Sequence, residues 1–219
     1  MSNLAIIPAR KNSKRLPGKN KMLLQGVPLI EHTVKSALES GVFKAIYIST
    51  DDEDLLYLKD KYGVEIFGLR PGNLATDSAS TIDVIKYTLG LYKEVGEDFD
   101  TITILQATSP LRNSEDIRNA YELYLTYKQP VISCKEEVLD NKFYYKKDTL
   151  NYKLINELTD MIYEINGAIY LTTPSNILSG EIFNNQFTPY IMSKLNSVDI
   201  DYEVDFLIAE MIKERENCE

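Results

Sequence analysis

Apolar and polar positions along the first 135 residues follow a regular alternation. Short apolar runs of strand length are separated by mixed stretches that begin with acidic or hydroxyl side chains and end at glycine or at polar residues. The runs indicate strands buried on both faces, and the stretches between them indicate helices. We predict strands at 3–8, 45–49, 64–67, 101–105 and 131–135, and helices at 28–40, 51–62, 81–95 and 114–128. This order predicts an α/β protein whose three layers enclose a mostly parallel sheet.

The alternation stops near residue 136. Residues 136–165 are rich in Tyr, Lys, Asn and Asp, and they lack the Val and Ile pattern of the first half. We interpret them as an arm that leaves the sheet, within a single domain that spans 1–219. Beyond the arm we predict strands at 167–172, 190–193 and 197–200 and a helix at 202–215. One face of that helix carries Val204, Leu207, Ile208 and Met211.

Charge is distributed very unevenly along the chain. The formal net charge is −9, from 24 Lys and Arg and 33 Asp and Glu, yet the first thirty residues contain no acidic side chain. Those thirty residues hold six cations, so the remainder has 18 − 33 = −15. An acidic protein with one concentrated basic loop lacks the broad basic face that nucleic acid or an anionic membrane requires. We therefore expect a small, highly charged anion as its ligand. The six cations are Arg10, Lys11, Lys14, Arg15, Lys19 and Lys21.

Other residue counts exclude several classes of protein. The single histidine, His32, lies in a predicted helix beside apolar residues, which argues against Ser-His-Asp hydrolysis and zinc hydrolases. The two cysteines, Cys134 and Cys218, do not form a disulfide framework, which fits the reducing cytoplasm. No apolar run approaches the roughly 20 residues of a membrane span, and Met1 begins no signal peptide.

The basic loop follows the first predicted strand directly. Ligands of open α/β sheets bind at the carboxyl ends of strands, where this loop lies. The small residues Ala9, Ser13 and Gly18 allow backbone N–H groups to approach phosphate oxygens, while the lysines and arginines supply charge. A solvated charged loop is the alternative, but the density of cations without a carboxylate favours binding of phosphate groups.

Asp199 and Asp201 form a second candidate site. In an extended segment their side chains project to one face, with Ile200 on the other. Two carboxylates on a strand end suit Mg²⁺, which completes its octahedron with water and phosphate. Alone, the pair is better explained by a helix cap at Asp201 and a solvated turn at Asp199. Beside a phosphate loop, however, a metal site becomes the better interpretation, because a triphosphate needs its charge neutralised.

Two further segments are expected at the same edge of the sheet. Gln106 follows the strand at 101–105 and is a plausible ligand contact, whereas Thr108 and Ser109 could equally form a turn before a proline. The loop 70–81 offers one cation and several small polar groups, a composition typical of both nucleotide cradles and ordinary loops. Asp51 and Asp52 are better explained by a helix N-terminus than by a metal site.

Five segments resemble one protein family. Residues 7–20 read IPARKNSKRLPGKN, which is similar to the N-terminal signature of the CMP-sialic acid synthetases, also called acylneuraminate cytidylyltransferases. The related enzymes for the eight-carbon acid Kdo usually carry Pro after Gly-Lys, so Asn20 favours the nine-carbon branch. The other four segments look like the same family in the same order. They are LRPGNLATD at 69–77, LQATSPLR at 105–112, NGAIY at 166–170 and SVDID at 197–201.

The resemblance implies a Rossmann-like nucleotidyltransferase fold, CTP and an acidic 2-keto sugar as substrates, Mg²⁺ as cofactor, and a homodimer. It implies that Arg10, Lys14 and Lys19 stabilise charge on the phosphates during catalysis. The nucleotide site would comprise Ala9, Arg10, Asn12, Ser13, Lys14, Lys19, Asn20, Arg70, Ser80 and Thr81; the sugar site Gln106, Thr108, Ser109 and Asn166; and the metal site Asp199 and Asp201.

The chain departs from the family in the arm at 136–165. Many members place arginines just before the NGAIY segment, near the sugar carboxylate or the partner subunit, and here that region has no arginine and carries Glu164. Four lysines are the cations that remain there, and four tyrosines suggest that the arm joins two subunits. The lysines are Lys142, Lys146, Lys147 and Lys153, and the tyrosines are Tyr144, Tyr145, Tyr152 and Tyr163.

Three alternatives to a cytidylyltransferase for a sialic acid-like sugar stay open. One is a cytidylyltransferase for another acidic sugar such as Kdo. Another is a nucleotide-sugar glycosyltransferase, which also uses a D-x-D pair but does not explain the basic loop. The last is a regulator that binds CTP without turnover, a hypothesis that the unusual arm motivates.

Overall fold

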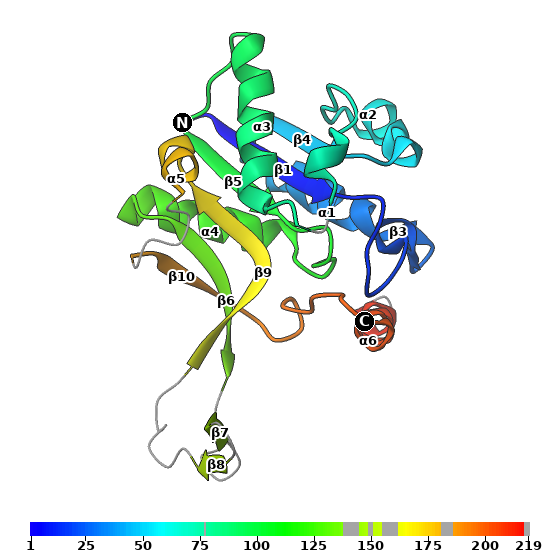
Figure 1. Ribbon diagram of the computed structural model, residues 1–219, viewed down its shortest axis with the longest axis vertical. Helices are drawn as coiled ribbons and strands as arrows, with labels where there is room; N and C mark the ends of the chain where they lie inside the picture. Colours follow the sequence, from blue (N-terminus) through cyan, green and yellow to red (C-terminus); the bar gives the residue numbers. More distant parts are fainter. Residues whose placement is uncertain (77, 138–144, 149–150, 155–161, 181–185, 217–219) are drawn as a thin grey trace.

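A six-stranded sheet forms the centre of the molecule (Figure 1). The computed structural model describes residues 1–76, 78–137, 145–148, 151–154, 162–180 and 186–216. Within this part of the chain the strand order is β10-β6-β9-β5-β1-β4. The strands are β1 (Asn3–Ala9), β4 (Ala45–Thr50), β5 (Thr101–Leu105), β6 (Val131–Glu137), β9 (Ile162–Thr172) and β10 (Thr188–Met192).

The sheet is mostly parallel, as the sequence predicts, and β9 is the exception. β1 pairs in parallel with β4 and β5, and β6 pairs in parallel with β10, whereas β9 runs antiparallel to both β5 and β6. The reason lies in the connection. The chain passes from β1 to its parallel neighbour β4 through a crossover that contains a helix. From β6, by contrast, the chain enters the arm and returns beside β6 as β9 without a crossover helix.

Helices cover both faces of the sheet and confirm the three layers. α1 and α4 pack together on one face, and α3 and α5 pack together on the other (Figure 1). The sequence of β1 is continuously apolar because both faces of this strand are buried. Leu4 and Ile6 pack beneath α3, while Ala5 and Ile7 pack beneath α1. The helices are α1 (Leu29–Ser40), α2 (Tyr57–Tyr62), α3 (Thr81–Glu94), α4 (Ser114–Tyr127), α5 (Pro174–Ser179) and α6 (Glu203–Glu216).

Several predicted elements differ in the structure. The predicted helix at 51–62 is a 3-10 turn (Glu53–Leu55) followed by α2, and the predicted strand at 64–67 reduces to one bridge between Glu65 and Tyr47. Residues 197–200 do not form a strand. Two further 3-10 turns (Lys19–Lys21, Gly72–Leu74) and a short hairpin of β2 (Leu23–Leu24) and β3 (Val27–Pro28) lie in segments where the sequence predicts loops.

Helix caps explain where two of the helices begin. Asn113, and not Ser114, caps α4, since its side chain accepts from the Asp116 N–H and Asp116 accepts from the Asn113 N–H in return. The Ser80 side chain caps α3, since its Oγ accepts from the Asp83 N–H. In the portion of the chain that the structure describes, no helix has both the length and the apolar character needed to cross a bilayer.

Glu31 joins α1 to α2 through a buried carboxylate. It accepts from the hydroxyls of Tyr57 and Tyr62 at 2.6 and 2.5 Å and from Lys61 Nζ at 2.8 and 2.9 Å. Burial alone would raise the pKa of this carboxyl, but the donors outweigh burial, and the pKa is lowered from its ordinary value. Glu31 therefore holds the short α2 against the body of the molecule.

The arm is shorter than the predicted range 136–165. β6 extends to Glu137 and β9 begins at Ile162, so both flanks of that range belong to the sheet. Between them, β7 (Tyr145–Asp148) and β8 (Asn151–Leu154) form an antiparallel pair, which lies beyond the ends of β6 and β9 in Figure 1. Lys142 and Tyr144 lie outside the described residues, as does Cys218.

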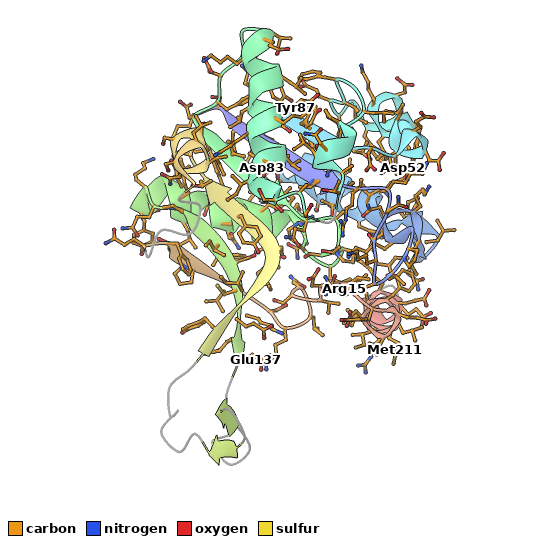
Figure 2. All side chains as sticks on the ribbon, in the orientation of Figure 1. Arg15, Asp52, Asp83, Tyr87, Glu137 and Met211 are labelled. Atoms are coloured by element: carbon orange, nitrogen blue, oxygen red, sulfur yellow. The ribbon has the colours of Figure 1, made fainter. Side chains whose placement is uncertain are left out.

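The apolar face that the sequence predicts for α6 is exposed to solvent. Phe206 and Ala209 are buried against Leu24, Leu29 and neighbouring apolar residues. By contrast, the four apolar residues that share the predicted face are all exposed in this single chain, and Met211, at 66% exposed, lies on the side of α6 away from the sheet (Figure 2). The four are Val204, Leu207, Ile208 and Met211.

Candidate active site

Two cavities adjoin each other at one edge of the sheet. The first, of about 680 Å³, lies where β1, β4 and β5 end, and the second, of about 520 Å³, lies beside it between β6, β9 and the segment before α6. Gln106 and Asp199 line both cavities. Most residues that the sequence predicts for the site line the first cavity. They are Arg10, Ser13, Lys14, Lys19, Asn20, Arg70, Thr81, Gln106, Thr108, Asp199 and Asp201.

Five predicted residues take other positions. Asn166 lines the second cavity, and the remaining four line neither. Ala9 is buried in the core beneath α1, Ser80 caps α3, and Ser109 is fully buried. Asn12 is exposed on the basic loop. Each of these four follows or precedes a residue that does line the first cavity, so all four lie in the loops around it, and their contacts with a substrate stay predictions.

The basic loop is closed by a hydrogen bond across its base. The Asn20 amide, which is buried, donates from Nδ2 to the backbone carbonyl of Arg10 at 3.0 Å. Gly18 has φ +68°, a conformation that side chains disfavour, and caps the 3-10 turn that carries Lys19. This turn directs Lys19 Nζ to Ile200 O at 2.9 Å and to Asp201 Oδ1 at 3.2 Å. The loop is thereby joined to the segment that carries the two aspartates.

Two of the six cations point away from the first cavity. Lys21 Nζ lies 3.0 Å from the buried Asp52 carboxylate and 2.6 Å from Asp54, and Lys11 Nζ lies 3.9 Å from Asp52. The backbone N–H of Lys11 donates to Asp51 at 2.7 Å. Asp52 also accepts from the Asp54 N–H at 3.2 Å, so the predicted role of helix N-terminus is confirmed. These carboxylates, which follow β4, attach the basic loop to the end of the neighbouring strand.

Arg70 lies between the end of β4 and its own loop. Its guanidinium donates to Ser49 Oγ at 3.1 Å, to Ser49 O, and to Leu74 O at 3.4 Å. Burial lowers the pKa of Arg70 from its ordinary value, and nearby Asp51 partly opposes this effect. The side chain therefore shapes the wall of the first cavity and contributes its charge from a fixed position.

Asp199 and Asp201 line the first cavity from an irregular segment and not from the predicted strand. Asp199 Oδ1 is buried and has no hydrogen-bond partner among the described residues. Burial raises the pKa of the Asp199 carboxyl, and the like charge of Asp201 adds to this effect. Asp201 pairs with Arg15 at 2.7 Å and with Lys19 at 3.2 Å. The two carboxylates thus form a negative site that faces the cation-rich side of the cavity.

The second cavity carries charges that the sequence analysis assigns to no site. Lys135 Nζ lies 3.1 Å from Glu164, and Lys194 Nζ lies 3.1 Å from Glu137, which occupies the end of β6 nearest the β7–β8 pair (Figure 2). Lys135 could have been found, because it ends a predicted strand at the same edge as Gln106. Lys194 and Glu137 have no such signal in the sequence.

The Asn166 side chain is bonded to the protein on both sides. Its Oδ1 accepts from Ser133 Oγ at 2.6 Å and from the Ala168 N–H at 3.1 Å, and its Nδ2 donates to Ser197 Oγ at 2.9 Å and to Met192 Sδ at 3.2 Å. Asn166 therefore joins β9 to β6 and to the segment that leads to Asp199. It lines the second cavity as part of the wall.

His32 lies outside both cavities, as expected from its place in the predicted helix. Its Nε2 is 3.1 Å from Leu24 O, and burial lowers the pKa of the ring. A role as general base in the site is excluded by this position.

The protein thus combines a mostly parallel α/β sheet with a cation-rich cavity and a facing carboxylate pair at the carboxyl ends of its strands. This combination is that of a nucleotidyltransferase, an enzyme that binds a nucleoside triphosphate at this edge of the sheet. The chain belongs to the cytidylyltransferase family, whose model matches residues 4–217.

Three relatives resemble the chain over nearly all of its length. It is 34% identical to CMP-N,N'-diacetyllegionaminic acid synthase of Legionella pneumophila, covering 98% of this chain and 97% of the relative. It is 30% identical to pseudaminic acid cytidylyltransferase of Campylobacter jejuni, covering 97% and 96%. It is 35% identical to N-acylneuraminate cytidylyltransferase of Escherichia coli, where it covers 98% of this chain but spans only 52% of the relative.

Two solved structures share the fold. CMP:2-keto-3-deoxy-manno-octonic acid synthetase complexed with CTP has a TM-score of 0.70 at 16% identity, covering 99% of this chain and 100% of its own. The 4-diphosphocytidyl-2C-methyl-D-erythritol synthase of Anaerococcus prevotii has a TM-score of 0.65 at 11% identity, covering 98% and 99%. The Rossmann-like α/β class predicted from the sequence is confirmed.

Proposed function

We propose that this protein transfers CMP from CTP to the anomeric hydroxyl of an acidic 2-keto sugar of the nonulosonic type and releases pyrophosphate. The observation that carries the proposal is the pair of adjoining cavities that share Gln106 and Asp199. One cavity is rich in cations and suits a triphosphate, while the other is polar and suits a sugar. The names of the three relatives support the same reaction, because each is a synthase or cytidylyltransferase of a nine-carbon acid.

The reaction follows from the position of the charged groups. The sugar hydroxyl oxygen forms a bond to the α-phosphorus of CTP, the bond from that phosphorus to the bridging oxygen breaks, and the hydroxyl proton passes to water. Negative charge grows on the departing pyrophosphate as this bond breaks. Arg10, Lys14 and Lys19 line the first cavity and are placed to stabilise that charge. Gln106 and Asp199 stand where the two substrates would meet.

We propose Mg²⁺ as the cofactor, held by Asp199 and Asp201. The residues present fit the ion, because Mg²⁺ takes carboxylate oxygens and Asp199 Oδ1 is a buried oxygen without a partner among the described residues. When bound, the ion would neutralise phosphate charge and polarise the phosphoryl oxygens. Lys19 and Arg15, which pair with Asp201, would then be released toward the phosphates.

A screen for pyrophosphate release tests the reaction. The protein is mixed with CTP and a panel of 2-keto acid sugars of eight and nine carbons, with ATP and UTP as controls. We expect release only with CTP, a sugar of this class and a divalent ion. Asp199→Asn should abolish most of it, whereas Asp60→Asn, a matched change on the exposed surface of α2, should not.

Other outcomes would identify another function. Release with Kdo alone would indicate an enzyme of the eight-carbon branch. Sugar transfer from a nucleotide sugar without pyrophosphate would indicate a glycosyltransferase. Binding of CTP without turnover of any sugar would indicate a regulator. Undiminished activity in excess chelator would contradict the proposed metal.

We also propose that the protein is a cytoplasmic homodimer joined through the arm. The β7–β8 pair beyond the sheet and the exposed apolar face of α6 support this arrangement, because such surfaces commonly meet a partner. Cys134, a buried free thiol, fits a reducing compartment. Light scattering should give twice the 25.0 kDa of one chain, and a value near 25.0 kDa at micromolar concentration would contradict the dimer.

The arm lysines remain candidates for binding the sugar carboxylate. Lys146 and Lys147 lie in β7 and Lys153 in β8, and the pairing places Lys146 opposite Lys153. The proposal is supported by the sequence, since residues 136–165 contain no arginine that could bind this carboxylate. Alanine at these positions should raise KM for the sugar, and an unchanged KM would refute the role while leaving the dimer untouched.

A further inference from the structure

A buried arginine, Arg112, binds the backbone of Gln106, the residue that lines both cavities. Arg112 is 1% exposed and follows two successive turns, from Gln106 to Ser109 and from Ser109 to Arg112, which bring its side chain back to the end of β5. Its Nη1 donates to two backbone carbonyls, Gln106 O at 3.2 Å and Ala168 O at 2.9 Å. Its Nε and Nη2 are buried without a hydrogen-bond partner among the described residues.

This burial is costly for a guanidinium. Burial lowers the pKa of Arg112 to about 9, and the negative charge of Asp116 on α4 opposes this shift. A buried charge without a close ion pair destabilises a fold, so the burial of Arg112 indicates that its two carbonyl contacts serve a purpose other than stability. Gln106, which supplies the first carbonyl, lines both cavities, and Ala168, which supplies the second, follows Gly167 in the wall of the second cavity.

The two carbonyls lie where regular pairing of β5 with β9 ends. The last paired residues are Leu105 and Ile169, so the next step of the ladder would join Gln106 to Ala168. At that step Arg112 Nη1 binds both carbonyls in place of a strand-to-strand bond. The strands are therefore held together at this point by a side chain.

β9 changes its register at the same level. The pairing of β6 with β9 shifts between Ile132, opposite Tyr170, and Cys134, opposite Ile165, so β9 bulges between these pairs, and Gly167 within the bulge has φ +78°. Ser133 fills the gap, since its Oγ donates to Asn166 Oδ1 and accepts from the Ile169 N–H at 2.7 Å. Bulges of this kind commonly redirect side chains next to active sites.

The bulge brings Gly167 against the Gln106 side chain. A Cβ at Gly167 would lie 3.0 Å from Gln106 Oε1, which is tighter than most Cβ contacts, so a side chain at this position would require the glutamine amide to shift by a few tenths of an ångström. Thr108 Oγ1 lies 3.5 Å from the same oxygen. Gln106 is thus enclosed on one side by the bulge and on the other by its own turn.

We propose that Arg112 and Gly167 are positioning residues that fix the Gln106 amide at the boundary between the nucleotide and sugar cavities. Arg112 sets the backbone position of Gln106 relative to β9, and Gly167 leaves the space in which its side chain lies. The assignment rests on the proposed function in one respect: the substrate that Gln106 orients is the acidic sugar. Displacement of Gln106 should therefore impair use of the sugar and leave CTP binding intact.

A double-mutant cycle tests this coupling. Gly167→Ala should lower kcat/KM for the sugar about 10- to 100-fold, as misplacement of an orienting group does, while the CTP dissociation constant measured without sugar stays within about twofold. In a Gln106→Ala background the same substitution should add little, because its effect passes through the missing side chain. Gly96→Ala is the matched control, since Gly96 has φ +79° and no atom within 4 Å of a built Cβ.

Arg112→Lys forms the second arm of the test. Lysine retains the charge but not the planar donor group, so it should reproduce the loss in sugar kinetics, again only when Gln106 is present. Should Arg112→Lys fail to fold, the Gly167→Ala cycle decides alone. Equal losses with and without Gln106, or a CTP affinity that weakens in proportion to sugar kinetics, would overturn the proposal.

A spectroscopic readout separates this inference from the function on which it rests. In protein labelled at glutamine side-chain amides, the Gln106 resonance, assigned by its loss in Gln106→Ala, should shift in Gly167→Ala and not in Gly96→Ala. Failure of the wild type to use any acid sugar would refute the proposed function but leave this shift to be seen. An unshifted Gln106 resonance in Gly167→Ala would refute the positioning role even in an active enzyme.

Discussion

Asn166 gives the clearest test of whether a predicted substrate contact is part of the scaffold. Truncation of Asn166 to alanine removes the acceptor of the Ala168 N–H, the partner of Ser133 Oγ and the donor to Ser197 Oγ, all of which are buried. Three such hydrogen bonds, at about 0.5–1.5 kcal/mol each, amount to about 3 kcal/mol. For a chain of this size, where 1 kcal/mol corresponds to roughly 2–4 °C, the midpoint of thermal unfolding should fall by about 6–12 °C.

The assay compares Asn166→Ala with Asn196→Ala by thermal unfolding and by steady-state kinetics. Asn196 is only partly buried and donates one side-chain hydrogen bond, from Nδ2 to Asp116 at 2.9 Å, so its loss should shift the midpoint by only about 2–4 °C. An Asn166→Ala protein with an unchanged midpoint and a sharply raised KM for the sugar would refute our reasoning. That result would mean that the amide binds substrate and not the neighbouring strands.

Three further predictions concern carboxylates. Asp199→Asn and Asp201→Asn should each lower kcat about 10²–10³-fold with the fold intact, and near-normal rates measured for both would show that neither acts in catalysis. Asp52→Asn should weaken CTP binding several-fold by releasing the basic loop, and more than Asp54→Asn, whose carboxylate is exposed; calorimetry that gives equal effects would contradict this anchor. Because the folded-state pKa of Glu31 is lowered, its contribution to stability is complete above the ordinary glutamate pKa and is lost as pH falls through the lowered value. The difference in unfolding midpoint between wild type and Glu31→Gln should therefore shrink on acidification, and a difference that grows would be contrary to the expected sign.

The sequence predicts the first half of the fold well because its signals are local. β1 is a continuous apolar run buried on both faces, and Ser80 marks the start of α3. The direction of β9 has no local signal, since it depends on how the chain returns from the arm. Nor could the apolar face of α6 be assigned from its pattern, because a stripe exposed to solvent and one packed on a core have the same periodicity.

Residues of the candidate site are likewise predictable from the sequence only where their signal is local. Arg10, Lys14 and Lys19 are found because cations are concentrated after a strand. Arg112, by contrast, looks like any arginine before a helix, and its importance arises from Ala168, 56 residues away. Asp199 and Asp201 were identified on the premise of an extended strand that does not exist, yet both reach the cavity, because the segment is anchored by the Ile200 N–H to Thr108 O at 2.8 Å.

The central place of β9 also has a consequence for biosynthesis. β5 and β6 are not neighbours, since β9 lies between them, so the two parts of the sheet have no strand-to-strand connection until β9 has been made. A nascent chain that has emerged only as far as the arm would expose the edge of β5 and would leave β6 without its main partner. Exposed strand edges template aggregation, and long-range pairing is slow. Ribosome pausing before β9 has emerged should therefore increase capture by chaperones, whereas pausing after it has emerged should not.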